Sequence, residues 1–548
     1  MTRLPRFLFP ALGLLSLALG SCGSLDGGPV GSGVLSFAKS GSIVQEEGRG
    51  SFRFGTATAA TQIEDRNPNT DWWVFTGPPE QGGLAKSPFV GEASLGYTLA
   101  IEDVKLLKEM NLDSYRFSIE WARIEPRRDV IDEEAIRHYS DLIDALLAAG
   151  IKPMVTIHHF SNPTWVDDPR DLACAEGPTD RNLCGLGHPV GGPLVIAEMA
   201  EHAKLIAERF GDRVDEWATW NEPMNYVLAA YGLGAFPPGK NRLFNFIDEF
   251  LPTIRDMLAS HAAMAKAIRE ADGRDADGDG RPADIGLTLA VIDWVPSRDG
   301  QPSDDPADVA ARERLEYALH WLPIDSLRNG TFDANADGVP DQWYPDWQGT
   351  LDWLGIQYYF RGGVTGAVAA VPVLDLAPCF DAFDLGACIP PGDPTFCVPI
   401  MGYEYWAPGL HDLIMDFSGR YPDLPLVVTE AGIQTRVGER RAENVVRTLE
   451  QIGLARAEGA DVRGYYHWSL YDNFEWALGY EPRFGLYSVD FSTYERTPTL
   501  GAEVLGRIAD ARSVDDDLRK RFGGTGPMTP EPGVPENPRT CNRADLAK

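Results

Sequence analysis

The sequence predicts an α/β fold built as a (β/α)8 barrel. Eight near-continuous apolar runs follow one another along the chain, and segments with amphipathic helical spacing separate them. Runs of this kind suit strands that are buried on both faces. Alternation of strand and helix through eight units predicts the barrel. The runs are Phe52–Ala59, Leu112–Ile119, Ile151–His158, Val214–Asn221, Ile285–Ile292, Trp353–Tyr359, Leu426–Glu430 and Val462–Leu470.

The connecting segments carry the helical half of the pattern. In the first one, apolar residues fall at i, i+3, i+4 and i+7 and continue beyond, which predicts a helix with one buried face. The residues on that face are Tyr97, Ala100, Ile101, Val104, Leu107 and Met110. We therefore expect a TIM barrel over residues 51–512 as a single catalytic domain.

Two of the predicted strands end in a glutamate that is followed by a chain-turning residue. The segment 219–223 reads TWNEP and contains Glu222, and the segment 427–432 reads VVTEAG and contains Glu430. Strands four and seven of such a barrel end at the same rim, where active sites lie. A facing pair of carboxylates is the minimum equipment for cleaving a glycosidic bond. The alternative for either glutamate is a buried salt bridge.

The formal net charge of −32 excludes several partners. Nucleic acid needs a basic surface, and anionic lipid headgroups repel an acidic one. We expect no nucleic-acid partner. The sequence makes no prediction of oligomeric state.

The first residues have the pattern of an export signal. Arg3 and Arg6 precede the apolar run Phe7–Gly20, which is too short to span a membrane. The residues LGSC that end at Cys22 resemble the bacterial lipobox, so residues 1–21 are predicted as a lipoprotein signal peptide and Cys22 as the lipidated residue. The alternative is an ordinary secretory signal. Residues 22–50 are predicted to be a flexible tether.

We therefore expect an exported protein with a lipid anchor in a bacterial membrane, either periplasmic or at the cell surface. Six cysteines besides Cys22 fit disulfides in such a compartment. Cys174 and Cys184 are predicted to pair, whereas Cys379, Cys388, Cys397 and Cys541 allow three pairings. Residues 513–548 are polar and Pro-rich, and are predicted to be disordered apart from a tie through Cys541.

Two Asp-rich loops match the first half of a calcium loop, in which alternate oxygen ligands wrap the cation. Both lack the glutamate at the twelfth position, so structural calcium and a plain solvated loop both stay open. The candidate ligands are Asp275, Asp277, Asp279, Asp333, Asn335 and Asp337. No cofactor for catalysis is implied.

Five blocks together resemble the retaining β-glycosidases of glycoside hydrolase family 1, over Phe52 to Asp510. The blocks are Phe54–Glu64 (FGTATAATQIE), Tyr115–Ile119 (YRFSI), Thr219–Pro223, Thr429–Gly432, and Trp468–Leu470 with Asn473–Trp476.

The resemblance implies roles for particular residues. Glu222 matches the general acid/base and Glu430 the nucleophile. Arg116 and Tyr359 match the groups that donate to the nucleophile, and Asn221 matches the contact to the sugar 2-hydroxyl. This implies that the two glutamates lie about 5–5.5 Å apart, as in retaining enzymes.

The sugar-binding positions also match the family. By resemblance, Trp468 is the stacking platform, and a carboxylate at position 475 disfavours phosphorylated sugars because it repels phosphate. Taken singly, a Gln or His here would be read as a helix cap or a core hydrogen bond. The matched residues are Gln62, His159, Asn221, Trp468, Glu475 and Trp476.

The chain departs from the commonest family pattern at Phe160, Gln357 and Ala431, none of which touches the reaction directly. The cysteine-bearing loop 371–399 and the neighbouring Trp406 are candidates for shaping the aglycone side.

The resemblance implies hydrolysis of β-glucosides and short β-gluco-oligosaccharides, with β-galactosides and β-fucosides as side activities. The expected partner is a β-linked oligosaccharide or an aryl or alkyl β-glycoside. Two alternatives stay open: a transglycosidase with the same site, and a catalytically silent sugar-binding lipoprotein.

Overall fold

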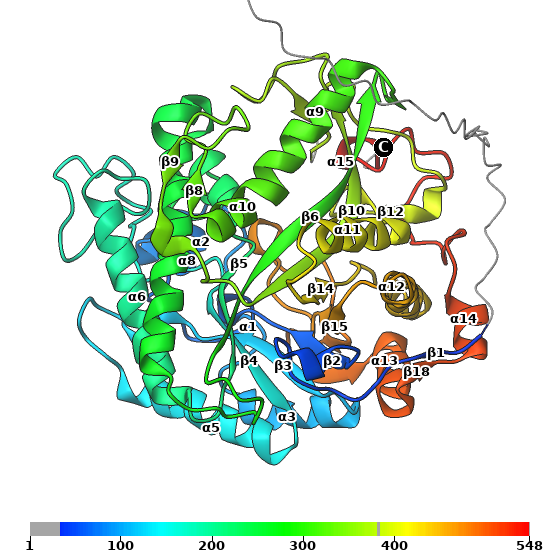
Figure 1. Cartoon of the computed structure of the whole chain (residues 1–548), viewed down its shortest axis with the longest axis horizontal. Helices are drawn as coiled ribbons and strands as arrows, with labels where there is room; N and C mark the ends of the chain where they lie inside the picture. Colours follow the sequence, from blue (N-terminus) through cyan, green and yellow to red (C-terminus); the bar gives the residue numbers. More distant parts are fainter. Residues whose placement is uncertain (1–32, 381–383, 547–548) are drawn as a thin grey trace, which may run out of the picture.

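The computed structural model describes residues 33–380 and 384–546. Eight parallel strands close into a barrel at its centre (Figure 1), and each overlaps an apolar run predicted from the sequence. Each strand pairs with the next along the chain, and the last pairs with the first. The strands are β2 (Arg53–Ala57), β3 (Ser114–Ser118), β4 (Lys152–His158), β5 (Glu216–Asn221), β6 (Asp284–Arg298), β10 (Trp353–Thr365), β14 (Leu426–Ala431) and β15 (Val462–Trp468).

Helices cover the outside of the barrel, one or two after each strand, as the alternating pattern predicted (Figure 1). The fold class is therefore confirmed. The covering helices are α3 (Ala100–Glu109), α5 (Glu133–Ala148), α6 (Gly191–Phe210), α8 (Leu251–Ala271), α9 (Pro306–Glu316), α10 (Leu322–Asn329), α11 (Ala407–Arg420), α12 (Gly438–Ala457) and α13 (Leu500–Ala511).

Shorter elements decorate this frame. The helical ones are α1 (Ala60–Ile63), α2 (Asp71–Thr76), α4 (Trp121–Ile124), α7 (Pro223–Val227), α14 (Asp516–Phe522), α15 (Arg543–Leu546), and the π-helical turns η3 (Leu228–Gly232), η5 (Phe246–Phe250) and η6 (Tyr317–Trp321). The short strands are β1 (Leu35–Ser36), β7 (Gln301–Pro302), β8 (Thr331–Phe332), β9 (Gln342–Trp343), β11 (Ala377–Pro378), β12 (Cys397–Val398), β13 (Tyr403–Glu404), β16 (Tyr487–Val489), β17 (Arg496–Pro498) and β18 (Ser513–Val514).

Helix α5 shows how the sequence sets a boundary and a buried face. Asp132 caps the helix, because its carboxylate accepts the backbone N–H groups of Glu134 and Ala135. The residues that follow bury one stripe against the barrel at helical spacing. The stripe consists of Ile136, Tyr139, Leu142, Ile143 and Leu146.

Helix α3 differs from its prediction in one residue. Ile101, expected on the buried face, is 46% exposed. The helix begins only at Ala100, and its buried face centres on Asp103, whose carboxylate accepts Arg496 Nη2 at 2.9 Å.

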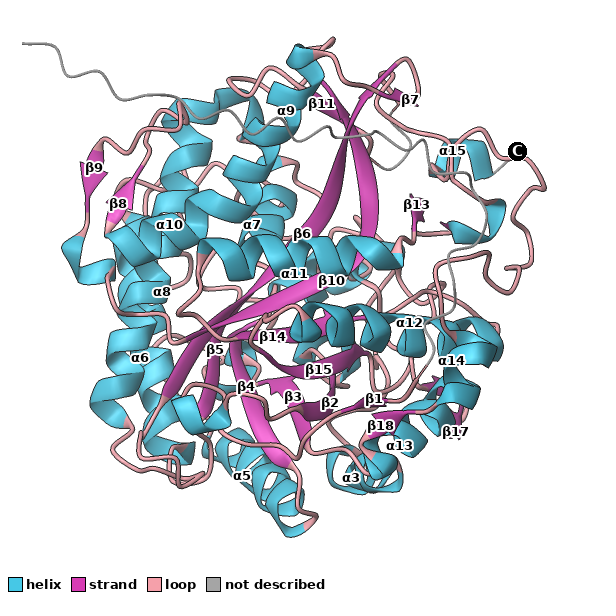
Figure 2. Ribbon diagram, turned by 45° about the vertical axis from the view of Figure 1, so that its right-hand side comes forward, coloured by secondary structure: helices cyan, strands magenta, loops and turns pink. Residues whose placement is uncertain are grey.

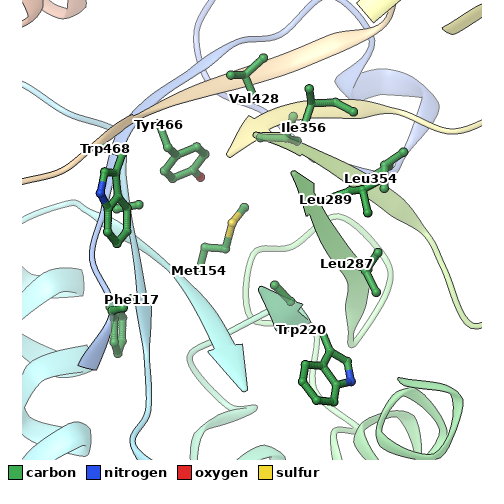
Figure 3. Close-up of a cluster of buried hydrophobic side chains, with 14 of the residues drawn as sticks. Phe117, Met154, Trp220, Leu287, Leu289, Leu354, Ile356, Val428, Tyr466 and Trp468 are labelled. Atoms are coloured by element: carbon green, nitrogen blue, oxygen red, sulfur yellow. The ribbon is translucent and has the colours of Figure 1, made fainter. Parts of the chain in front are cut away.

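Apolar side chains fill the middle of the barrel, where Met154 of β4 and Tyr466 of β15 point into the space between the strands (Figure 3). A Cβ atom at Gly55 would lie 2.4 Å from the Tyr466 ring. Glycine at that position of β2 therefore makes room for the tyrosine.

A buried ion pair joins the amino-terminal ends of two barrel strands. Arg53 Nη1 of β2 lies 2.8 Å from Oε1 of Glu216 of β5, and both side chains are at most 2% exposed. Arg53 also donates from Nη2 to the carbonyl of Gly41 at 3.0 Å. The charges are therefore paired where water does not reach them.

The described parts of the predicted tether and tail are ordered, which corrects both expectations for residues 33–50 and 513–546. Strand β1 pairs with β18, and Phe37 and Ile43 are buried. In the tail, Arg519 donates to Glu450 at 2.8 Å and Phe522 is buried. The two polar segments order because they pair with each other and with α12.

Three disulfides join cysteines in the described ranges: Cys174–Cys184, Cys379–Cys388 and Cys397–Cys541. The first confirms the predicted pair, and the last ties the tail to strand β12. Residues 1–21 and Cys22 lie outside the described residues. Within the described ranges, no helix is long and apolar enough to cross a membrane.

Strands β6 and β10 are much longer than the other barrel strands (Figure 2). They stay paired as far as Val364 and Pro296, beyond the point where β5 and β14 end. One side of the carboxyl-end rim is therefore raised into a wall.

We expect Glu216→Gln to destabilise the fold, because it leaves the Arg53 guanidinium buried without its charge partner. The loss should be roughly 3–5 kcal/mol, measured as a lower urea midpoint. The double variant Arg53→Met with Glu216→Leu should recover much of it. Equal midpoints for Glu216→Gln and wild type would contradict the assignment.

Candidate active site

Glu222 reaches the rim because the chain turns sharply at the end of β5. Its backbone is left-handed (φ 40°, ψ 55°), and Pro223 starts helix α7 directly after it. The Glu222 N–H donates to the carbonyl of Thr288 at 2.8 Å. A left-handed conformation costs a non-glycine residue roughly 1–2 kcal/mol, so neighbouring contacts must hold it in place. The turn presents the carboxyl group to the cavity that Glu222 lines.

Glu430 lies near the end of β14 and is 4% exposed. Each carboxylate oxygen accepts one hydrogen bond from another strand. Arg116 of β3 donates from Nη1 to Oε1 at 2.6 Å, and the hydroxyl of Tyr359 of β10 donates to Oε2 at 2.8 Å. The two donors predicted from the sequence therefore meet at this carboxylate and fix its orientation.

Hydrogen bonds to its side-chain oxygen hold Asn221 in place. Its Oδ1 accepts Arg116 Nη2 at 2.6 Å, Gln357 Nε2 at 2.8 Å and Thr288 Oγ1 at 3.1 Å. Three donors on the oxygen assign the amide orientation, and they leave Nδ2 to donate toward the cavity that Asn221 lines. Gln357, one of the departures from the family pattern, thus orients Asn221.

The two glutamates differ in what compensates their charge. Burial and, after it, the charge of Glu430 raise the pKa of Glu222 to about 8, while a hydrogen bond from Asn225 Nδ2 at 3.1 Å opposes the rise. Burial also raises the pKa of Glu430, but Arg116 and Tyr359 oppose that rise directly. The proton therefore resides on Glu222 and the negative charge on Glu430.

The sugar-binding residues predicted from the sequence lie beside this pair. His159, Trp468, Glu475 and Trp476 line the same cavity as the two glutamates. Burial and the charge of Arg116 lower the pKa of His159 well below its usual range, so its ring is neutral.

Gln62 lies one layer behind them, since it is fully buried and donates to the carbonyl of Phe474 at 2.7 Å. Burial raises the pKa of Glu475 to about 8, and a hydrogen bond with Gln62 opposes that rise. Gln62 therefore fixes the segment that carries Glu475.

Three contributors were missed by the sequence reasoning: Thr288, Asn225 and Asn473. Thr288 holds Asn221, Asn225 donates to Glu222, and Asn473 accepts Gln62 Nε2 at 3.3 Å. Asn225 lies three residues after Glu222, which is neighbour spacing on a helix, and could have been found that way. Trp406 does not line the cavity; it lies under the Arg361 guanidinium, 4.2 Å from the ring centre.

The Asp-rich loops differ from each other. Carboxylate oxygens of Asp275 and Asp277 lie within 4.8 Å of one another and of Asp215, while Asp279 accepts Ser42 Oγ at 2.5 Å. Calcium there stays a prediction.

In the second loop the side chains bond to the protein itself. Asn335 donates to Asp337 at 3.2 Å, and Asp333 accepts Tyr317 at 2.9 Å. Among the described residues this loop forms no comparable group of carboxylates.

A barrel rim that holds a protonated glutamate and an ionised glutamate oriented by arginine and tyrosine is typical of a glycosidase. The family model "Glycosyl hydrolase family 1" matches residues 44–511. The chain belongs to this family and hydrolyses β-glycosidic bonds with retention of configuration.

Relatives and solved structures agree with this assignment. The chain is 28% identical over 518 residues to a beta-galactosidase of Pyrococcus woesei, covering 85% of this chain and 98% of that protein. It is 31% identical over 495 residues to beta-glucosidase 1B of Phanerodontia chrysosporium, covering 83% and 84%. A beta-glycosidase structure from Pyrococcus horikoshii matches with a TM-score of 0.70 and 28% identity, covering 88% and 98%.

The pKa of Glu222 predicts how activity falls at high pH. Glu222 must be protonated to donate to the leaving oxygen, so kcat/KM should fall as pH rises through about 8. The Asn225 hydrogen bond favours the ionised form. Asn225→Ala should therefore move this limb upward by roughly half a unit to one unit.

The matched control is Asn241→Ala, at an exposed asparagine outside the cavity lining, which should leave the profile in place. The measurement is kcat/KM for 4-nitrophenyl β-glucoside from pH 5 to 10. A limb that stays fixed in Asn225→Ala would show that another group governs it.

Proposed function

We propose that this protein is a β-glucosidase of the exported, lipid-anchored kind, acting on neutral glucosides. The observation that carries the sugar preference is the position of Glu475 beside the catalytic pair, with Gln62 behind it. A carboxyl group in that position can bridge two adjacent ring hydroxyls and offers a phosphate no positive charge to pair with. β-Galactosides and β-fucosides are the proposed side activities, and some relatives carry the name β-galactosidase and others β-glucosidase.

The reaction follows from the two protonation states. Glu430 attacks the anomeric carbon while Glu222 gives its proton to the leaving oxygen, so a glycosyl ester forms and the aglycone departs as an alcohol. Ester formation removes the negative charge of Glu430. The pKa of Glu222 then falls, because that charge no longer raises it, and Glu222 takes a proton from the water that cleaves the ester.

The two alternative functions, a silent sugar-binding lipoprotein and a transglycosidase, make different demands on the residues of this rim. A silent sugar-binding lipoprotein has no need of both glutamates and the Arg116 and Tyr359 donors, all of which are in place. A transglycosidase uses the same ester but delivers it to a sugar, and nothing in the comparisons favours that outcome.

Hydrolysis of 4-nitrophenyl glycosides by the mature domain tests the proposed sugar preference. The β-glucoside should turn over fastest, with β-glucose as the first anomer seen by NMR, and Glu430→Ala should abolish turnover. The control Glu208→Ala changes a glutamate on the outer helix α6 that is about half exposed, 49%, and should retain full activity. A faster β-galactoside would reverse the proposed preference, and α-glucose as the first product would contradict retention.

Two features support the proposed anchor and export. The residues that end at Cys22 resemble a lipobox, and three disulfides suit an oxidising compartment. With the full chain in a bacterial host, an alkyne-labelled fatty acid should enter the wild type and not Cys22→Ser. Equal labelling of both would contradict the anchor, and a reduced, cytoplasmic protein would contradict export.

A further inference from the structure

The catalytic pair opens onto a cavity of about 640 Å³ that extends well beyond the sugar-binding residues. The far part is walled by segments that follow β5, β6 and β10. Its half-buried apolar side chains keep surface that a ligand could cover. They include Leu228, Phe236, Leu319, Phe360, Val371 and Met401.

The π-helical turns give a second, independent observation. In the described part of the chain they occur at η3, η5 and η6, and each contributes apolar residues to this cavity. Leu228 comes from η3, Phe246 and Phe250 from η5, and Leu319 from η6. π-Helical turns are rare and are found mainly at functional sites. Three of them around one cavity, in elements distant in sequence, indicate a built binding surface.

Two polar groups on the far walls are committed to other protein groups, whereas Tyr403 and Trp294 each carry one polar atom there that bonds to no protein group in the described structure. Arg361 Nε donates to Glu404 Oε2 at 2.5 Å, and the hydroxyl of Tyr317 donates to Asp333 at 2.9 Å. A chain of sugar rings would bury many hydroxyls there with few partners, which costs free energy. A hydrocarbon surface would lose only its contact with water.

We propose that the substrate of this enzyme is a β-glycoside with an apolar aglycone longer than one sugar ring, which lies in this cavity against η3, η5 and η6. The proposal rests on the glycosidase function above and narrows its substrate class. The tail forms part of the same wall through Thr540 and Cys541, and Cys541 is tied to Cys397. A segment outside the barrel therefore helps to shape the aglycone side.

A series of n-alkyl β-glucosides tests the proposal. Glucose release from the methyl, butyl, hexyl and octyl glucosides is compared with release from cellobiose and cellotriose, using the oxidised full-length mature protein below the micelle-forming concentration. We expect kcat/KM to rise about two- to four-fold per methylene, mainly through KM, until the cavity is filled. Octyl glucoside should exceed methyl glucoside at least about tenfold, as that rise requires over several methylenes, and it should also exceed cellobiose.

Two cavity variants test whether the rise of kcat/KM per methylene depends on the apolar walls. Leu319→Asn on η6 and Val371→Asn on the loop after β10 should each flatten the rise per methylene, and having two variants guards against misfolding of one. The matched control is Leu454→Asn, at a 45% exposed leucine of α12 outside the cavity lining, which should keep the wild-type rise.

The outcomes separate this proposal from the one on which it rests. A flat alkyl series, or cellotriose as the better substrate, would overturn the apolar aglycone while leaving the glucosidase in place. A rise that survives in both cavity variants would also overturn it. An absence of turnover on every glycoside, including 4-nitrophenyl β-glucoside, would overturn both.

Discussion

The site depends on one guanidinium. Arg116 is fully buried and joins two groups that must act together, the carboxylate of Glu430 and the oxygen of Asn221. A buried arginine is tolerated only when its charge is paired, and a buried carboxylate stays ionised only beside such a charge. The buried positive charge of Arg116 and the buried negative charge of Glu430 therefore depend on each other. Glu430, Asn221 and Arg116 come from three different strands, so closure of the barrel is what creates the pair.

Two chemically identical side chains acquire opposite states at this rim because their neighbours differ. Glu430 accepts from a cation and a hydroxyl, whereas Glu222 accepts from the neutral amide of Asn225. The field of Glu430 also acts on Glu222, so loss of that charge in the glycosyl ester changes the proton affinity of Glu222 at the moment when a base is needed. Glu222 is therefore the acid in the first step of the reaction and the base in the second.

The barrel and the catalytic centre could be predicted from the sequence, because both are encoded in local patterns. Each strand is a continuous apolar run, and each glutamate lies beside the residue that turns the chain. Failures came where distant segments meet. The polar ends of the chain order by pairing Leu35 with Val514, and Gln357 acts through a neighbour on another strand. Local composition carries no signal for such contacts. The tail was therefore predicted to be disordered, and the pairing of the four remaining cysteines was left open.

The catalytic groups, which must be fixed, and the aglycone walls, which can vary, come from different parts of the fold. Strand ends carry the catalytic groups, and strands are held in register by ladders on both sides. The aglycone walls come largely from segments between the barrel strands, where π-helical turns occur and disulfides tie Cys379 to Cys388 and Cys397 to Cys541. A wall built in this way can change its chemistry without moving Arg116, because none of its side chains takes part in the hydrogen bonds that hold Glu430 and Asn221.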